Sequence, residues 1–533
     1  MTIQEAFVQT SSDRLSQLSG IPLDTILEHL DLVTYTNLRL TSRQLSTNTI
    51  HSRFFRSAKT DLSLSSLHSL RDRVADPQLG PMLREITVVA TLFDTQPAEA
   101  TVQTRKKWPG FDKDELRRDM ENYRQRVENL RERSVACTDE EVQEARRDLD
   151  WIQARIQQDT NTDVDQVTDL LSSIFENAAN LRTINLDACI IAGHAKTCRP
   201  AEHYRWYRSA FKYSSWPSMW TAASQTFRIV TSAISSSRVE LEKFQIFPGT
   251  PLCSVQLRHV EDHCRALNSD SLVAACKNIT SFGLSFSTHM LIEASSTQGE
   301  GLFRHAFAAK SPYRLNQHLE SDAEDFTGAA TILTYMPNLA SLYLHLHHLD
   351  HLVLPEYTQA FAHISQAIRL GRLRELSLRG LPLRPDDLVL FLINHPAITK
   401  LSLDGILLVG GSWSTAFSCI EAMPALESLH LSSLSTEYHH ITNLDPVKCT
   451  FEVDLQDREK WVTCGGGHIL HKRYMCREEI RQGLDFKPQP GPRNIWGDDT
   501  WGYFERFQYE FGAPPSIWEW DPLTEDVLDA LLI

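Results

Sequence analysis

A short apolar pattern that recurs along the chain does most to restrict how it can fold. The pattern is apolar-x-x-apolar-x-apolar, and its four regular copies are Leu339, Leu342 and Leu344; Leu373, Leu376 and Leu378; Ile398, Leu401 and Leu403; and Leu426, Leu429 and Leu431. Successive copies start 34, 25 and 28 residues apart. Because alternate residues of a strand point to one face, each copy predicts a short β-strand with that face buried.

The stretches between these strands have the spacing of helices. Their apolar residues recur every three or four positions: Phe361, Ile364 and Ile368; Leu388, Phe391 and Leu392; Phe417 and Ile420. Each unit therefore changes from alternating to helical period, which predicts a strand followed by a helix. Such a unit cannot cover its own apolar edge, so its core must form by stacking on neighbouring units.

These units resemble the long form of the leucine-rich repeat. Weaker copies precede them: Leu83, Ile86 and Val88; Leu181, Ile184 and Leu186; Leu241, Phe244 and Ile246; Ile279, Phe282 and Leu284. The resemblance implies an α/β fold in which residues 61–455 form an irregular leucine-rich-repeat solenoid, and the uneven spacing predicts large insertions. A conventional α/β sheet with similar strands is the alternative.

A second informative segment lies near the N-terminus, where residues 21–45 read IPLDTILEHLDLVTYTNLRLTSRQL. Pro22 stands one step inside an expected helix start, where its missing N–H costs nothing. Further apolar residues follow at Ile26, Leu27, Leu30, Leu38 and Leu40. About forty residues cannot bury much of their own surface, so we expect this unit to need a partner.

The segment resembles the F-box, especially its fungal form. The resemblance implies a three-helix unit over residues 15–60 that docks on a Skp-type adaptor and so joins a cullin-based, SCF-type ubiquitin ligase. The adaptor-facing residues that it implies are Ile21, Pro22, Ile26, Leu27, Leu30, Leu38 and Leu40. Between Pro22 and Asp31 this chain is about one helical turn shorter than the usual F-box motif. The usual spacing is restored if Leu18, and not Ile21, is aligned with the first leucine of the motif. An ordinary helical cap on a larger domain is the alternative.

Residues 104–160 are highly charged and contain two apolar seams with heptad spacing. The seam residues are Leu116, Met120, Tyr123, Val127 and Leu130, then Val142, Ala145, Leu149, Ile152 and Ile156. Thr138 and Glu141 have the spacing of a capping box that starts the second helix. The break between the seams predicts an antiparallel helical hairpin inserted between early repeats, with coiled-coil dimerisation as the alternative.

Two further segments differ from the array in composition. Residues 196–225 interleave basic and aromatic side chains, which can stack on nucleotide bases. The net charge of −15 argues against general nucleic-acid affinity. We therefore expect an insertion whose aromatic residues pack on the parent domain. Residues 456–533 are rich in Trp and acidic toward the end, and we expect an irregular cap on the array.

Residues that could support chemistry are few. Cys464, His468, His471 and Cys476 are of the types that hold zinc, but their C-x3-H-x2-H-x4-C spacing is not that of a usual zinc knuckle. We expect neither metal nor other cofactor, although a zinc site or an enzyme active site in this region stays a third possibility. No nucleophile elbow, HExxH motif or dinucleotide fingerprint occurs. A cluster of histidines lies on and just after one predicted strand: His345, His347, His348 and His351. These histidines could form a binding site, but polar residues on the exposed surface of a repeat explain them equally well.

The expected function is therefore non-catalytic: the N-terminal unit would hold a ligase and the array would hold a target of unknown identity. A ligase-independent repeat scaffold is the alternative. The sequence contains no run of eighteen apolar residues, which is about the length needed to span a bilayer, so we expect no membrane partner. The first residues lack a secretory signal, and ten scattered cysteines fit a reducing compartment, which predicts cytosol or nucleus.

Overall fold

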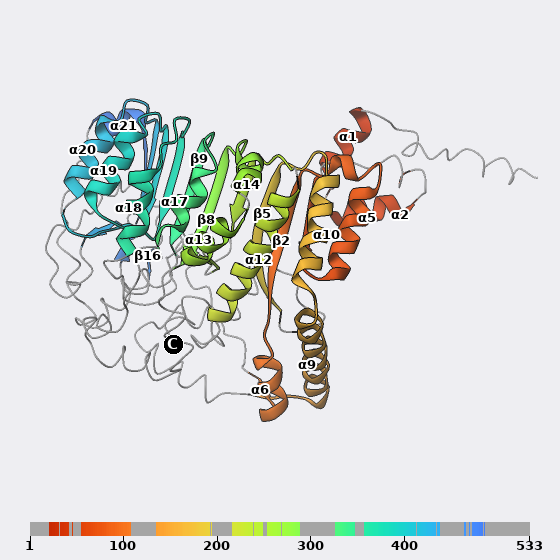
Figure 1. The fold of residues 1–533 in the computed structure, drawn as a ribbon. Coiled ribbons are helices and arrows are strands. Elements are labelled where there is room, and N and C mark those ends of the chain that lie inside the picture. Colours follow the sequence, from red (N-terminus) through yellow and green to blue (C-terminus); the bar gives the residue numbers. More distant parts are fainter. Residues whose placement is uncertain are drawn as a thin grey trace, which may run out of the picture.

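The computed structural model describes residues 21–30, 32–41, 45, 55–107, 135–191, 193, 216–237, 239–248, 253–267, 269–287, 326–346, 357–411, 413–432, 434–436, 463–464, 468–469, 472–482 and 484. Within these residues the chain is a mixed α/β fold around one long, mostly parallel sheet, and no sheet in this part closes into a barrel. Figure 1 shows the sheet with a layer of helices along one face.

The sheet has eleven strands in the order β1-β2-β5-β6-β8-β9-β10-β12-β14-β18, and β7 pairs with β8 off this path. The bounds are Ser57–Asp61 (β1), Glu85–Phe93 (β2), Thr183–Ile191 (β5), Lys243–Ile246 (β6), Val255–Gln256 (β7), Ser281–Ser287 (β8), Ser341–Leu346 (β9), Glu375–Arg379 (β10), Lys400–Asp404 (β12), Ser428–Ser432 (β14) and Lys472–Cys476 (β18). The pairings from β1 to β14 are all parallel, whereas β18 pairs antiparallel with β14. The strands thus follow one another across the sheet in chain order.

The helices that connect these strands form the second layer (Figure 1). Their bounds are Leu64–Ala75 (α5), Val164–Asn177 (α10), Trp216–Ser236 (α12), Leu257–Ala266 (α13), Ser269–Cys276 (α14), Gly328–Thr334 (α17), Thr358–Ala367 (α18), Pro385–Asn394 (α19) and Trp413–Ala422 (α20). A short 3-10 helix, Gly80–Met82, precedes β2. Neither these nor any other described helix is both long and apolar enough to cross a membrane.

The repeated apolar positions form the core between the two layers. Leu342, Leu376, Leu401 and Leu429 are register partners across four adjacent strands, and Leu344, Leu378, Leu403 and Leu431 form a second ladder beside them. All eight side chains are buried. A fully buried leucine side chain contributes about 1.5–3 kcal/mol, so these ladders stabilise the stacking of neighbouring strands. The strands predicted from both the regular and the weaker copies are confirmed, and the apolar residues of the weaker copies are buried as well.

The regular units share a turn between strand and helix. Two-residue strands, Pro382–Leu383 (β11), Leu407–Leu408 (β13) and Ser435–Thr436 (β15), form a separate parallel sheet beside the main one. Gly380 and Gly405 precede two of them with φ of +63° and +60°, a conformation that glycine adopts without steric cost. The chain therefore turns in the same way in successive units.

The second helix of the predicted hairpin is present as α9, Asp139–Thr160. It begins at the predicted capping box, in which the Thr138 hydroxyl accepts from the Glu141 amide and the Glu141 carboxylate accepts from the Thr138 amide. The first predicted helix lies outside the described residues. Among those described, α9 packs beside α6, Gln96–Thr104, and the short strands β3, Lys106–Lys107, and β4, Val135–Ala136, pair next to it (Figure 1).

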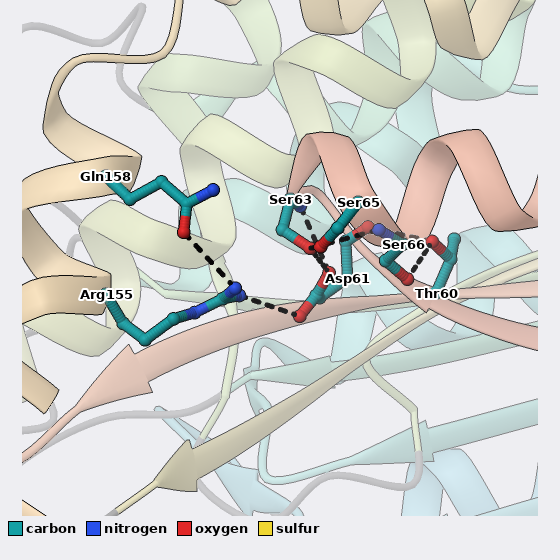
Figure 2. A network of polar contacts seen from close by, with 7 residues as sticks. All are labelled: Thr60, Asp61, Ser63, Ser65, Ser66, Arg155 and Gln158. Carbon is teal, nitrogen blue, oxygen red and sulfur yellow. Dashed lines mark hydrogen bonds and ion pairs between the residues drawn. The ribbon is translucent and has the colours of Figure 1, made fainter. Parts of the chain in front are cut away.

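A polar network attaches α9 to the first edge of the sheet (Figure 2). Arg155 lies 3.6 Å from the Asp61 carboxylate at the end of β1, and both side chains are partly buried. Asp61 in turn accepts from the amide and hydroxyl of Ser63, the N-cap residue of α5. Burial raises the pKa of Asp159, while Arg155 lowers it and Asp61 raises it further. The helix is thus fixed to the main sheet as well as to α6.

The two ends of the described chain differ in how they join this fold. At the N-terminal end, α1 (Ile21–Glu28) and α2 (Leu32–Thr41) are two of the three expected helices, and the segment expected to form the third lies largely outside the described residues. At the other end, β18 and α21 (Arg477–Arg481) bring Met475, Ile480 and Leu484 into the core. The tryptophans of the predicted cap from Trp496 onward are not described.

One expected boundary differs from the structure. The aromatic and basic segment was predicted over residues 196–225, but its last ten residues belong to α12. Trp220 is buried in the main core there, because it lies on the same helix face as Ala223 and Phe227. The rest of that segment, residues 196–215, lies outside the described residues.

Candidate functional site

The N-terminal helical unit has a small core of its own. Leu23 and Leu27, one turn apart on α1, pack with Tyr35 of α2. Leu30, Leu38 and Phe55 are partly buried against them. The Tyr35 and Phe55 rings meet edge to face with centroids 6.2 Å apart. This core is separate from the main core between the sheet and its helices.

The residues predicted to face an adaptor fall into different environments. Leu27 is only 1% exposed, so its side chain serves the unit's own core and is not on the surface a partner would meet. Leu30 and Leu38 pack on that core and are half-buried, as is Ile26. Leu40 is 79% exposed at the end of α2. Ile21 and Pro22 form the first turn of α1.

Two arginines tie this unit together and to the main fold. The Arg39 guanidinium lies over the rings of Tyr35 and Phe55, at 5.6 and 5.2 Å from their centroids. Arg73 of α5 stacks on the same Phe55 ring and donates to the Phe55 carbonyl oxygen at 2.8 Å. Cation–π contacts of this kind contribute about 0.5–1 kcal/mol at exposed sites and more when desolvated. Phe55 lies outside the N-terminal motif, and no local pattern marked its role.

The second candidate surface is the face of the sheet opposite the helices. Strand alternation places the repeat leucines toward the helices and the residues between them on this face, which we call the polar face. From β9 to β18 one register line of this face is Tyr343, Ser377, Ser402, His430 and Tyr474, the middle row. On β10 and β12 charged residues lie two positions away on either side of it, and Lys472 lies two positions from Tyr474 on β18.

At the carboxyl ends of the strands the charged residues are largely buried. Arg379 of β10 lies 3.2 Å from the carboxylate of its register partner Asp404, with side chains 15% and 5% exposed. A carboxylate this buried needs such a partner, because the desolvation of an unpaired charge is costly. Burial raises the pKa of Tyr343, while the charge and hydrogen bond of Arg379 oppose the shift.

At the amino ends of the same strands the charges are paired in solvent. Lys400 donates to the Glu375 carboxylate at 2.7 Å, and this hydrogen bond raises the pKa of Lys400. Both side chains are well exposed, so the pair adds little stability. Its effect is to leave no net charge at this border of the middle row.

Aromatic contacts characterise the middle row itself. The Ser402 hydroxyl lies 2.9 Å from Nδ1 of His430. The rings of His430 and Tyr474 stack with centroids 4.3 Å apart and 13° between their planes. Tyr474 is 64% exposed, although its partner ring is half-buried. This arrangement leaves most of the Tyr474 side chain accessible to a partner, which suits binding.

The histidine cluster and the possible zinc ligands are only partly described. His345 is buried on β9 with its ring against Tyr343, while His347, His348 and His351 lie outside the described residues. Cys464 and His468 are register partners in a two-stranded hairpin, β16 (Thr463–Cys464) and β17 (His468–Ile469). Cys476 is the exposed N-cap residue of α21, and His471 is not described. Within the described residues no group of three or more His, Cys, Asp or Glu could hold a metal ion.

Two buried thiols, Cys264 and Cys276, are poor nucleophiles. Burial raises the pKa of Cys264 to about 12, and it raises that of Cys276 to about 12 as well. A thiol must ionise to react, so both stay in the unreactive protonated form at neutral pH.

In comparisons with known proteins, no protein-family model matches the chain and no curated protein matches it.

Proposed function

We propose that the protein is a substrate-recruiting subunit of an SCF-type ubiquitin ligase that acts in the cytosol or nucleus. The helical unit of α1 and α2 would bind a Skp-type adaptor and, through it, the cullin complex. The polar face of the sheet would bind the target protein. The protein would thus act by raising the local concentration of a target near the ligase, without bond chemistry of its own.

The proposed binding of the adaptor rests on one observation: some apolar residues of the helical unit are buried in its own core, whereas another is exposed. Leu23, Leu27 and Tyr35 already form a core, and Leu40 still stands 79% exposed beside it. A single exposed leucine is common on protein surfaces, but beside a unit too small to bury much of its own surface it offers a partner an apolar contact. The unit is attached to α5 through Phe55 and Arg73, so an adaptor bound there would be held at one end of the sheet.

The target-binding part rests on the repeated units. Parallel strands in chain order, the leucine ladders and the shared glycine turns support a leucine-rich-repeat solenoid. On the face opposite the helices the charged residues at the carboxyl ends of the strands are buried, whereas the middle row is partly exposed. The partly exposed side chains are the ones that could vary with the target.

The first prediction concerns the adaptor. In the full chain, Leu40→Asp should abolish co-purification with a recombinant Skp-type adaptor, since a carboxylate buried at an apolar interface costs several kcal/mol. Every 1.4 kcal/mol is a factor of ten in affinity, so the loss should be evident even from a nanomolar start. Ile393→Asp is the matched control, because Ile393 is an exposed apolar residue on α19 at a distance from the unit.

The alternative is a repeat scaffold that binds targets without a ligase. The short stretch between Pro22 and Asp31 favours it, because α1 has only eight residues. The test compares the wild-type protein with a variant that has one helical turn added between Pro22 and Asp31. If only the lengthened variant captures the adaptor, the result supports this alternative and contradicts the ligase proposal.

A further inference from the structure

The outer side of α19 exposes two apolar residues that we call the α19 patch. Leu390 and Ile393, three residues apart and therefore on one side of the helix, are 37% and 64% exposed. In the part of the chain that the structure describes, no other helix exposes two large apolar side chains to this extent. Single apolar residues are normal on a protein surface, whereas an adjacent pair can mark a contact.

The neighbouring helices are polar at the same level. α18, α19 and α20 each have ten residues and pack side by side (Figure 1). The sixth residues of the three helices are His363, Leu390 and Ser418, and the ninth residues are Gln366, Ile393 and Glu421. The patch is therefore specific to α19 and is not a property of the repeated unit. Glu421 is the residue of α20 that corresponds to Ile393, and the axes of packed helices lie about 8–10 Å apart.

The last described residue, Leu484, lies beside this level of the helix layer. β18 is the last strand of the sheet, and α21 follows it against β14. Arg477 of α21 donates to the Pro424 carbonyl oxygen, just beyond α20, at 3.0 Å. Leu484 then donates its amide to the Glu421 carboxylate at 2.6 Å, and its side chain is in the main core. From β18 to Leu484 the chain thus runs inward to α20, and α19 is the next helix in that direction.

The residues that follow Leu484 have a sequence suited to covering the patch. They lie outside the described part of the chain and read DFKPQPGP from Asp485 to Pro492. Phe486 is two residues beyond Leu484, and two extended residues span about 7 Å, so its ring can reach the next helix. The three prolines of this stretch fix φ and favour an extended backbone, which reduces the conformational entropy lost on docking.

We propose that residues 485–492 dock on the α19 patch as a strap, with the Phe486 ring covering Ile393 and Leu390. The strap continues from the contact between Leu484 and Glu421 across the outer side of the helix layer. It lies on the opposite side of the fold from the polar face, so it does not compete with a target there. The docking requires neither the adaptor nor a target, and it goes beyond the proposed function.

The test uses the full chain with Phe486 replaced by the photoreactive amino acid p-benzoylphenylalanine, irradiated at low protein concentration and analysed by peptide mass spectrometry. The benzophenone ring bonds to nearby C–H groups, so we expect a cross-link to the peptide that contains α19. Adding Ile393→Asp should lower the yield of that cross-link by about tenfold, since a carboxylate under an apolar ring loses hydration. Val273→Asp is the matched control, because Val273 is 41% exposed on α14, another helix of the same layer. Equal thermal melting of the two Asp variants shows that the loss is local.

Three results would overturn the inference: no cross-link to α19 within one chain, an equal yield with and without Ile393→Asp, or cross-linking only between two copies with a yield that rises with protein concentration. The last result would mean that a second copy covers the patch. A chain that captures the adaptor but lacks the cross-link refutes only the strap. A chain that forms the cross-link but never captures the adaptor refutes only the ligase proposal.

Discussion

His395, at the end of α19, joins two neighbouring units through one side chain. Its Nε2 accepts a hydrogen bond from the Leu370 amide at 3.0 Å, and its Nδ1 lies 2.7 Å from the Phe391 carbonyl oxygen. Because Nε2 accepts, the proton of the neutral ring is on Nδ1, which donates to Phe391. Burial lowers the pKa of His395, with Arg369 acting in the same direction, so the folded protein favours this neutral form.

Replacing this histidine should therefore cost stability in a pH-dependent way. His395→Leu leaves the buried Leu370 amide without its acceptor, and we expect a loss of about 1–3 kcal/mol in the free energy of unfolding by urea. The histidine's contribution should be complete above about pH 6.5, the value for an unfolded chain, and should decline as pH falls through the lower folded pKa. The gap between wild type and variant should narrow on acidification, and a gap that stays constant or widens would contradict this reading.

The residue scale also shows the limit of sequence patterns. The leucines of the ladders could be predicted because burial repeats with a fixed period. His395 and Phe55 could not, since each acts through a single contact that no period marks. Tyr474 faces His430 only because β18 pairs antiparallel with β14, a long-range contact that neither local sequence contains.

At the scale of elements, the turn after β10 depends on glycine. Gly380 has a φ of +63°, and a Cβ added there would lie 2.6 Å from the Leu346 carbonyl oxygen of the preceding unit. Both the left-handed conformation and the close approach exclude a larger residue. The turn therefore sets how closely two units stack.

Gly380→Ala should lower the free energy of unfolding by about 1–2 kcal/mol or more, because an L-residue is strained at this φ. Gly371→Ala is the matched control, since nothing lies within 4 Å of its added Cβ. That variant should be neutral or slightly stabilising. Chemical denaturation of both proteins decides the point, and equal midpoints for the two variants would refute the argument.

The sequence predicts the α9 helix but not the part of the fold to which it is attached. Its start at the capping box follows from Thr138 and Glu141, which act within one turn. Its attachment through Arg155 to Asp61 joins segments far apart in sequence, and its seam is only partly buried because Ile156 remains exposed. The helix is thus more closely tied to the main sheet than a hairpin that only pairs with itself.

At the scale of the whole molecule, the order of the strands follows from the sequence because each apolar copy forms one strand and parallel strands join in chain order. The split between two cores does not follow. The resemblance of the N-terminal motif predicts that its apolar residues face a partner, whereas Leu27 lies in the unit's own core. Spacing alone cannot say whether an amphipathic helix covers its face with its own chain or with another.

The central claim is that the helical unit binds the ligase while the sheet stays free for a target. Hydrogen exchange of the full chain, measured with and without a recombinant Skp-type adaptor, tests it most directly. The account predicts slower exchange within residues 21–45 and unchanged exchange in β9, β10, β12 and β14. Unchanged exchange in residues 21–45, or protection of those four strands instead, would contradict it.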